Sequence, residues 1–294
     1  MIRILTDSTT DIPQKIVEEY GIVVLPLYVI IEGREYLDRV EISTEEVYSY
    51  MRRNIVPTTS QINYADTENV IRKHIEDGED LIYIGFSGRM SGTFRLVETI
   101  MEDISDEYPS RRLAAIDSRG GSFATGIIVM RAAEAAVEAA DNKTPGAEAA
   151  AYESLTARIR EMIANIEHVF VITDLNWMIR GGRISKTLGY TANLLGIKPV
   201  LDVDDGEMEV IHKVRGTKRA MTKVADIVAE RAKDYPDQMV GITHADDIEA
   251  AEAMKALIKA RLPGCSFMTE LIGAVLGVHI GIGGVGVFFL RKDC

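Results

Sequence analysis

The sequence predicts an α/β protein of two domains, and three observations support this. In the first half, short apolar runs alternate with longer amphipathic runs, which is typical of strands and helices that build a mostly parallel sheet. In the second half, Asp205-Gly206 separates two alternating apolar runs, which predicts a hairpin and therefore a mixed sheet. The length of 294 residues suits two domains, which we expect to cover residues 1–165 and 166–294.

Capping and breaking residues set the ends of the elements in the first half. We expect Asp11 to cap a helix that has Pro13 in its first turn, and Ser43 opens a Ser-Thr-Glu-Glu capping pattern. The expected strands are 2–5, one or two strands within 22–31, 81–85 and 113–116. The expected helices are 13–20, 45–53, 66–78, 91–104 and 121–140.

The clearest break in the pattern is the polar run 141–148, which contains a Pro-Gly turn signal. The hairpin is expected over 199–214. The other expected strands of the second half are 169–173, 239–243 and 285–290, and the expected helices are 149–166, 217–233 and 248–261. The second half is therefore expected to be α/β with some antiparallel pairing.

Composition and charge exclude several classes of protein. Apolar residues make up 47% of the chain and charged residues 27%, which excludes disorder of the whole chain. Lys and Arg number 33 against 45 Asp and Glu, and a net charge of −12 argues against a broad nucleic-acid-binding surface. The two cysteines, Cys265 and Cys294, can form neither a disulfide framework nor a zinc site, so we expect no metal and no cofactor.

The chain shows no expected secretion signal or membrane span. The apolar run 2–5 is too short for a signal peptide, and the run 21–31 is half of a span and contains Pro26. We therefore expect a cytoplasmic protein.

Four short runs rich in Ser, Thr and Gly are the first candidates for a binding site. Three of them follow expected strands, at 6–10, 87–93 and 117–122, and the fourth, at 57–61, precedes a helix. In a parallel sheet the loops after the strands lie at one edge, where ligands bind, and hydroxyls beside free N–H groups at helix starts suit a carboxylate or a phosphate. The alternative is that these hydroxyls only cap helices.

Signatures of known enzyme classes are mostly absent. The run 281–286 has the spelling G-x-G-x-x-G, but a strand follows it where a dinucleotide fingerprint needs a helix. There is no phosphate-binding loop of the Walker type, and the run 120–124 lacks one glycine of a nucleophile elbow.

The five histidines differ in their surroundings. Gly277 and Gly281 flank His279, so a ligand can approach the backbone there, and we favour a functional role for this imidazole. His244 follows a strand end, where it is a site residue or a neighbour of a helix cap. The other three are expected to be structural or on the surface: His74, His168 and His212.

A local basic cluster follows the single tryptophan. Arg180, Arg183 and Lys186 lie close to Trp177 in an otherwise acidic protein. The cluster is either the solvated end of a helix over 175–179 or a docking patch for an acidic partner or a phosphate.

Seven short runs together resemble the DegV family of bacterial fatty-acid-binding proteins. They occur in the family's order and span nearly the whole chain: ThrAspSerThrThrAspIlePro at 6–13, ProThrThrSerGln at 57–61, SerGlyThr at 91–93, AspSer at 117–118, GlyGlyArgIleSer at 181–185, IleLysPro at 197–199 and HisIleGly at 279–281. At 282 this chain has Ile where the family usually has Pro, and the segment 141–152 is less like the family.

The resemblance implies a two-domain α/β protein that holds one long-chain fatty acid near the domain junction, with the acyl chain in a buried apolar tunnel. By residue matching, Thr59 and Ser91 would bind the carboxylate, with His279 close by. The residues expected to line the head-group site are Ser60, Gly92 and Thr93. Some family members present the bound acid to an ATP-dependent kinase subunit, and Arg183 is similar to the residue that contacts that partner.

Three hypotheses of function follow. The first is a fatty-acid carrier with no catalytic centre of its own, which the resemblance favours. The second is an acyl hydrolase or transferase that uses Ser91 and His279. The third is an enzyme that binds a phosphate or a nucleotide in the hydroxyl-rich loops, against which the missing phosphate-binding loop counts.

Overall fold

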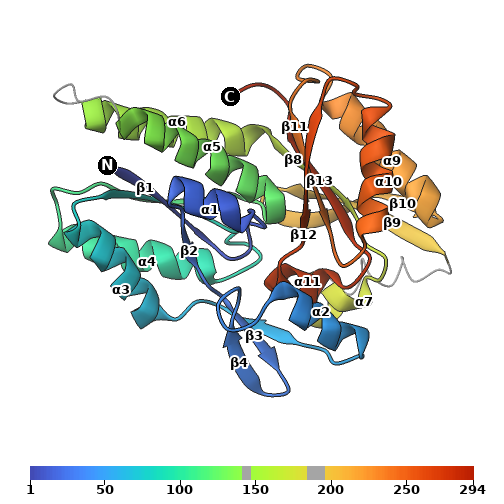
Figure 1. The fold of residues 1–294 in the computed structure, drawn as a ribbon, viewed down its shortest axis with the longest axis horizontal. Coiled ribbons are helices and arrows are strands. Elements are labelled where there is room, and N and C mark those ends of the chain that lie inside the picture. The colour runs from blue at the N-terminus through green and yellow to red at the C-terminus, as the bar shows by residue number, and fades with distance from the viewer. Residues whose placement is uncertain (141–146, 184–195) are drawn as a thin grey trace.

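The computed structural model describes residues 1–140, 147–183 and 196–294, and it arranges them as three sheets with helices on their faces (Figure 1). A four-stranded sheet belongs to the first half of the chain and a six-stranded sheet to the second half. A small three-stranded sheet from the first half lies below them in Figure 1, next to helices α2, α7 and α11. The predicted α/β class with one parallel and one mixed sheet is confirmed.

All strands of the four-stranded sheet are parallel, in the order β2-β1-β6-β7. These strands are β2 (Val23–Leu25), β1 (Ile2–Asp7), β6 (Asp80–Gly85) and β7 (Leu113–Asp117). Strand β6 is buried along its whole length, as expected for a central strand covered on both faces. The runs 6–10, 87–93 and 117–122 therefore begin at one edge of this sheet, where β1, β6 and β7 end.

The described part of the first half contains six helices. They are α1 (Gln14–Tyr20), α2 (Thr44–Arg52), α3 (Tyr64–Glu76), α4 (Thr93–Glu107), α5 (Ser122–Ala140) and α6 (Ala147–Asn165). The capping box at Ser43 is confirmed, because its side chain accepts from the Glu46 N–H and the Glu46 carboxylate accepts from the Ser43 N–H. The prediction that Asp11 caps α1 is wrong: Pro13 occupies the N-cap position, and no side chain caps the helix.

The apolar run 22–31 forms two strands in different sheets, β2 and β3 (Tyr28–Ile31). Strand β3 pairs antiparallel with β4 (Arg34–Leu37) and with β5 (Thr58–Ser60), which places Thr59 opposite Val29. Strands β4 and β5 were not predicted. They are short and largely exposed, so their sequences do not alternate between apolar and polar residues.

The six-stranded sheet has the order β10-β9-β8-β13-β11-β12 and is antiparallel except between β11 and β12. Its strands are β8 (Ile166–Val171), β9 (Ile197–Asp204), β10 (Glu207–Arg215), β11 (Met239–His244), β12 (Ser266–Leu271) and β13 (Val285–Leu290). The described helices of this half are α7 (Asn176–Gly181), α9 (Thr217–Arg231), α10 (Ile248–Lys259) and α11 (Ala274–Ile280). Helix α11 and strand β12 were not predicted.

The hairpin prediction is confirmed, with Asp205 and Gly206 at the turn between β9 and β10. Both residues have positive φ, which matches the right-handed twist of the two strands. The tip of the hairpin contacts the first half of the chain: Ser87 Oγ donates to the Gly206 carbonyl at 2.7 Å, and Arg89 and Arg119 pair with the Asp205 carboxylate.

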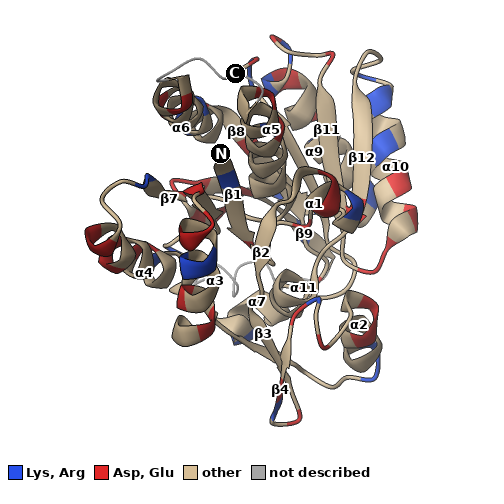
Figure 2. Cartoon of the chain, turned by 60° about the vertical axis from the view of Figure 1, so that its left-hand side comes forward, with Lys and Arg blue, Asp and Glu red and all other residues tan. Residues whose placement is uncertain are grey.

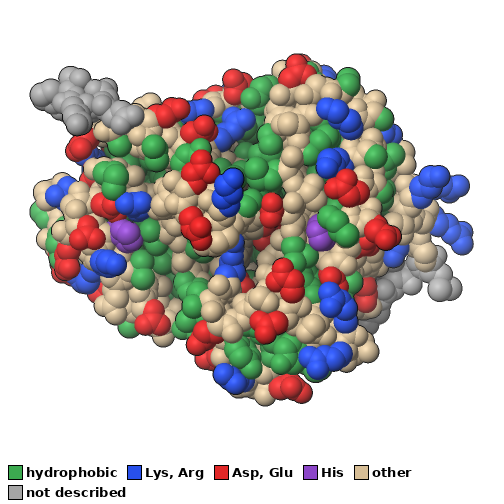
Figure 3. All heavy atoms as spheres, in the orientation of Figure 1, with side chains coloured by type: hydrophobic (Ala, Val, Ile, Leu, Met, Phe, Trp, Pro, Cys, Tyr) green, Lys and Arg blue, Asp and Glu red, His purple; other side chains and the backbone are tan. Residues whose placement is uncertain are grey.

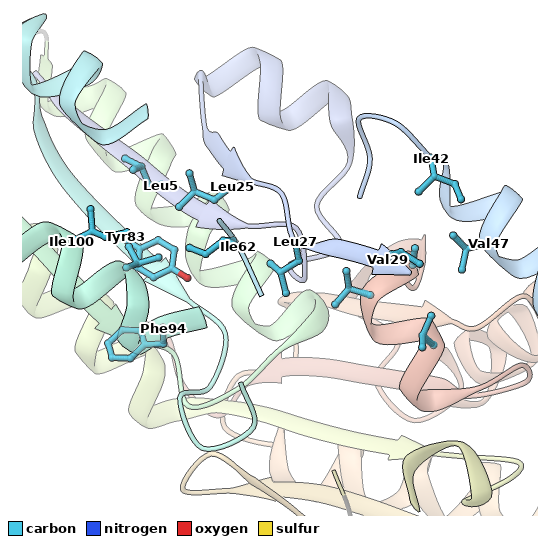
Figure 4. Packing of buried hydrophobic residues seen from close by; sticks show 14 of the residues in the cluster. Leu5, Leu25, Leu27, Val29, Ile42, Val47, Ile62, Tyr83, Phe94 and Ile100 are labelled. Carbon is cyan, nitrogen blue, oxygen red and sulfur yellow. The ribbon is translucent and has the colours of Figure 1, made fainter. Parts of the chain in front are cut away.

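The hydrophobic core joins the two halves of the chain. One buried cluster contains Leu5, Leu27 and Tyr83 of the first half together with Ile272 and Val278 of the second. Figure 4 shows part of this cluster extending from Leu5, Tyr83 and Phe94 through Leu27 to Ile42 and Val47. Helix α5 packs against β1 and β6 and also against β11 and β13, so it is shared by both large sheets. The domain boundary near residue 165 stays a prediction; β8 begins the second sheet at Ile166.

Charged side chains lie on the outer helices, such as α3, α4 and α10, whereas the strands between the helices are mostly uncharged (Figure 2). On the face shown in Figure 3, acidic and basic side chains are mixed, with apolar atoms between them. Among the described residues, no helix combines the length and the apolar character needed to cross a membrane.

Gly126 sets how closely α5 approaches the first hydroxyl-rich run. A Cβ atom at this position would lie 2.5 Å from the backbone oxygen of Thr10, which a side-chain rotation cannot relieve. We predict that Gly126→Ala lowers the free energy of unfolding by about 1–3 kcal/mol, although Ala is the better helix former. Urea unfolding measures this. The exposed Val137→Ala on the same helix is the control and should change stability by about 0.5 kcal/mol or less; a stabilised Gly126→Ala would contradict the close approach.

Candidate functional site

A cavity of about 330 Å³ lies where the two halves of the chain meet. All four hydroxyl-rich runs contribute to its wall, although they are far apart in sequence. Besides Met90, the residues from these runs are Thr9, Thr59, Ser60, Gln61, Ser91, Gly92, Gly121 and Ser122. The volume falls within the range of small-molecule sites, so the cavity is the candidate ligand site.

Close backbone approaches at glycines bring the runs together. A Cβ on Gly92 would lie 2.7 Å from Gln61 Oε1, so the runs 57–61 and 91–93 are neighbours. A Cβ on Gly121 would lie 2.1 Å from the ring of Phe86, which itself lines the cavity. A larger residue at 92 would displace the end of the flexible Gln61 side chain, whereas a larger residue at 121 would meet the Phe86 ring of the cavity wall.

The Thr59 hydroxyl and the His279 imidazole form the polar centre of the wall. Strand β5 positions Thr59 and helix α11 positions His279, and Thr59 Oγ1 lies 2.8 Å from His279 Nε2. Burial, and secondarily the nearby Arg183 charge, lower the pKa of His279 to about 4. The ring is therefore neutral at physiological pH.

The neutral ring favours one arrangement of protons. The other ring nitrogen, Nδ1, is buried and has no partner among the described residues, and Gly181 packs against it. A proton on Nδ1 would be a buried donor without an acceptor. The proton therefore belongs on Nε2, which donates it to Thr59 Oγ1. The Thr59 O–H then remains free to donate to a ligand.

Ser91 lines the cavity just before α4, and its hydroxyl bonds to Thr93. Ser91 Oγ accepts from the Thr93 N–H at 3.2 Å and donates to Thr93 Oγ1 at 3.1 Å, which fixes the turn before the helix. Ser60, Gln61 and Gly92 are exposed, so this end of the cavity is close to solvent. Thr93 was expected to line the site, but it is fully buried behind Ser91 and is not part of the cavity wall.

The geometry does not support a Ser91–His279 pair of a hydrolase. Among the described residues, the hydrogen bonds of Ser91 go to Thr93, and the hydrogen bond of His279 goes to Thr59. A nucleophile and its base need to be within hydrogen-bond reach of each other, and no such contact joins these two side chains.

The rest of the wall is mostly apolar and comes from both halves. Sequence reasoning missed these residues, because their positions follow no local pattern. They are Leu27, Phe86, Met90, Phe170, Val171, Ile172, Met178, Val203, Met208, Ile272, Val275, Leu276, Ile280, Val285, Gly286 and Phe288. Thr243 and His168 also line the cavity and were not predicted as site residues.

Arg183 connects the cavity to the surface. It lines the cavity, is exposed, and donates to the Gly181 carbonyl that ends α7. Arg180 lies over the Trp177 ring at 5.7 Å, and this ring packs against Gly281. The predicted cluster member Lys186 lies outside the described residues.

The remaining histidine predictions and the glycine-rich run have structural explanations. His244 Nδ1 accepts from the Asp247 N–H at 3.2 Å, just before α10, so it is a neighbour of a cap and not a cavity residue. His74 pairs with the Glu79 carboxylate at 2.7 Å. The run 281–286 connects α11 to β13 with no helix after it, as expected for a chance match to the dinucleotide fingerprint.

Comparisons with known proteins agree with this architecture. A family model described as an uncharacterised protein of the DegV family matches residues 1–292. The chain belongs to the DegV family. A DegV domain-containing protein of Caldanaerobacter subterraneus is 33% identical, and one of Clostridium acetobutylicum is 32% identical, each with 99% of both chains covered.

Solved DegV structures have the same fold. The DegV family protein of Thermus thermophilus, described by its fatty acid binding, has a TM-score of 0.84 at 28% identity, with 98% of both chains covered. DegV of Bacillus subtilis, described as a fatty acid binding protein, has a TM-score of 0.82 at 26% identity and the same coverage. These values place the whole described chain within the two-domain DegV fold.

A buried carboxyl group lies directly behind the cavity wall. Asp11 accepts hydrogen bonds from Ser122 Oγ and from the Gly273 N–H at 2.7 Å, and Ser122 lines the cavity. Burial raises the pKa of Asp11 to about 7, against the opposing effect of these two hydrogen bonds.

This raised pKa predicts a pH dependence of stability. The folded chain binds the Asp11 proton more tightly than the unfolded chain, so the stabilisation is complete below pH ~4 and is lost as the pH rises to ~7. Asn at this position cannot titrate. We predict that the free energy of unfolding of Asp11→Asn rises relative to that of the wild type between pH 4 and 7, by up to about 1.4 kcal/mol per pH unit. Urea unfolding at several pH values measures this, and a constant difference would contradict the buried carboxyl.

Proposed function

We propose that the protein binds one long-chain fatty acid, with the carboxylate at Thr59, Ser91 and His279 and the acyl chain in the apolar part of the cavity. The observation that supports this most directly is that one cavity has a polar end and an otherwise mostly apolar wall. Neutral hydroxyl and imidazole donors gather at its solvent-near end, and apolar side chains from both halves make up most of its remaining wall.

Elementary energetics fit an acyl chain. Burying a sixteen-carbon chain gains roughly 0.8 kcal/mol per methylene, or roughly 12 kcal/mol before the costs of association. A carboxylate that leaves water needs hydrogen-bond donors. The Thr59 hydroxyl is free to donate, and the Ser91 hydroxyl becomes a second donor when it turns from Thr93 Oγ1 to the ligand. The DegV proteins of Thermus thermophilus and Bacillus subtilis, both described by fatty acid binding, support the same ligand class.

The protein acts as a carrier under this proposal, and it presents the bound acid to an ATP-dependent kinase that phosphorylates the carboxylate. Arg183 supports a partner at this end, because it is exposed and also lines the cavity beside His279. Loaded protein and ATP, added to an extract of the source bacterium, should yield an acyl phosphate that hydroxylamine traps. If the amount of trapped acyl phosphate is the same with and without the added protein, this role is contradicted.

Native mass spectrometry of the purified protein, followed by organic extraction, tests the ligand. We expect one long-chain fatty acid per chain, because the acyl chain and the head group each have a complementary part of one cavity. A protein that is empty after purification and also fails to bind added palmitate would disprove the proposal.

Two substitutions test the head-group site. Thr59→Ala and Ser91→Ala each remove a hydroxyl donor, so each should weaken fatty-acid binding by about 1–3 kcal/mol, or roughly 5- to 150-fold in Kd. Displacement of a fluorescent fatty acid measures the affinity. Thr222→Ala, which removes an exposed helical hydroxyl outside the cavity, is the matched control and should bind as the wild type does. Wild-type affinity in both variants and in their double mutant would remove these residues from the site.

A further inference from the structure

The turn end of the β9–β10 hairpin, residues 203–208, forms part of the cavity wall, and we call it the hairpin tip. Val203 and Met208 are directly opposite each other in the two strands, and both line the cavity. On the first half of the chain, Met90 lines the same cavity, and the adjacent Arg89 pairs with carboxylates of the hairpin tip. The hairpin tip therefore closes the cavity against the first half at this point.

Exposed ion pairs hold the hairpin tip in place. Asp205 pairs with Arg89 at 2.9 Å and with Arg119 at 3.1 Å, and Glu207 lies 3.5 Å from Arg89. All four of these side chains are more than half exposed, and ion pairs of this kind are weak and are screened by salt. One buried hydrogen bond, from Ser87 Oγ to a carbonyl of the turn, adds to them.

The backbone pairing of the hairpin tip is also limited. Strand β9 pairs with β8 at Val200 and Leu201, so beyond Leu201 it pairs with β10 alone among the described strands. A β-bulge interrupts the register of β10 opposite this point, between Val210 and His212. Bulges bend strands, which makes this the place where the hairpin can bend. By contrast, β13 pairs with β8 along its whole length and with β11 on its other side, so it is held more firmly.

The hairpin tip also borders a second, polar cleft. This cleft has a volume of about 1200 Å³, and Val203, Asp204 and Asp205 are among the residues that line it. Val203 lines the cavity as well, so the two spaces share a wall at this point. A displacement of the hairpin tip would therefore open the cavity toward the cleft. Elsewhere the apolar wall contains fully buried side chains, such as Ile172 and Met178, which have no comparable freedom.

We propose that the hairpin tip is the gate through which the fatty acid enters and leaves, and that the pairs of Asp205 with Arg89 and Arg119 hold this gate closed. The inference rests on the proposed function. An enclosed acyl chain exchanges only when part of the wall moves, and the hairpin tip is held by exposed charges that water and salt ions can replace. Opening requires no change at Thr59 or His279, which lie on β5 and α11.

A gate has a kinetic signature that a binding contact lacks. Loosening the gate raises the association and the dissociation rate constants by the same factor, so Kd, which is their ratio, does not change. The loss of a contact that supports only the bound acid would instead raise the dissociation rate constant and weaken binding. Stopped-flow fluorescence with a fluorescent fatty acid measures both rate constants, the dissociation being followed after a chase with excess palmitate.

Asp205→Asn removes the charge and keeps the turn, because Asn tolerates the positive φ of this position. We expect both rate constants to rise about 2- to 20-fold, with Kd unchanged. A rise of the NaCl concentration from about 50 to about 500 mM should act in the same way on the wild type and less on the variant. Asp226→Asn breaks an equally exposed pair with Arg261 within the second half, so it is the matched control and should exchange the acid as the wild type does.

A disulfide across the gate tests the opposite change. A Cβ at Gly206 would lie 2.6 Å from Ser87 Oγ, so cysteines at these two positions are close enough for a disulfide. Ser87→Cys combined with Gly206→Cys is made in a Cys294→Ser background, and the remaining Cys265 is buried. The oxidised protein should bind and release the acid more slowly than the reduced protein, by about tenfold or more. Both forms carry the same strain at 206, so this strain does not affect the comparison.

Unchanged rate constants in Asp205→Asn, or a raised dissociation rate constant with a correspondingly weaker Kd, would overturn the gate while the fatty acid still binds. Equal exchange rates in the oxidised and reduced cysteine variant would overturn it as well. Failure of the wild type to bind either the fluorescent acid or palmitate would instead overturn the proposed function, and the gate with it.

Discussion

The hydrogen bonds of Asp11 join the three segments on which the cavity depends. The residue directly follows the first hydroxyl-rich run, and its carboxylate accepts from Ser122 at the start of α5 and from the amide of Gly273 just before α11. Helix α11 carries His279, and α5 is packed between the two large sheets. One short side chain thus fixes the first half of the chain against the second at the back of the site. Asp11 itself has positive φ, a conformation that Asp tolerates better than most residues.

The polar end of the cavity relies on neutral groups. Arg183, the one cation among the described residues of the cavity wall, is exposed, while Thr59, Ser91 and the uncharged His279 are partly or largely covered. A carboxylate bound by neutral donors is held less strongly than by a buried cation, and its release leaves no unpaired charge behind. That balance is compatible with the proposed role of a carrier, which has to both retain and release its ligand.

The sequence predicts the sheet class, most helices and the hairpin, because each depends on local periodicity, caps and turns. The convergence of the three runs that follow β1, β6 and β7 could also be anticipated, because the ends of parallel strands share an edge, whereas the run 57–61 reaches the cavity through the antiparallel pairing of β5 with β3. The failures have a common physical cause. The local sequence predicts that Asp11 caps a helix. Its role is instead determined by Ser122 and Gly273, which lie 111 and 262 residues away in the sequence. Likewise, the apolar wall from Leu27 to Phe288 and the position of His168 in it follow from strand register, which no local pattern contains.

The hairpin turn shows how one residue can satisfy two independent constraints. Gly206 has a φ of +85°, which the tight turn between β9 and β10 requires, and a Cβ there would lie 2.6 Å from Ser87 Oγ. The carbonyl of the same residue is the acceptor for that hydroxyl. Any side chain would therefore disturb the local turn and the contact between the two halves at once. A dipeptide that predicts a local turn therefore also marks, in this fold, a point at which two distant parts of the chain meet, through a side-chain hydroxyl of one and a backbone carbonyl of the other.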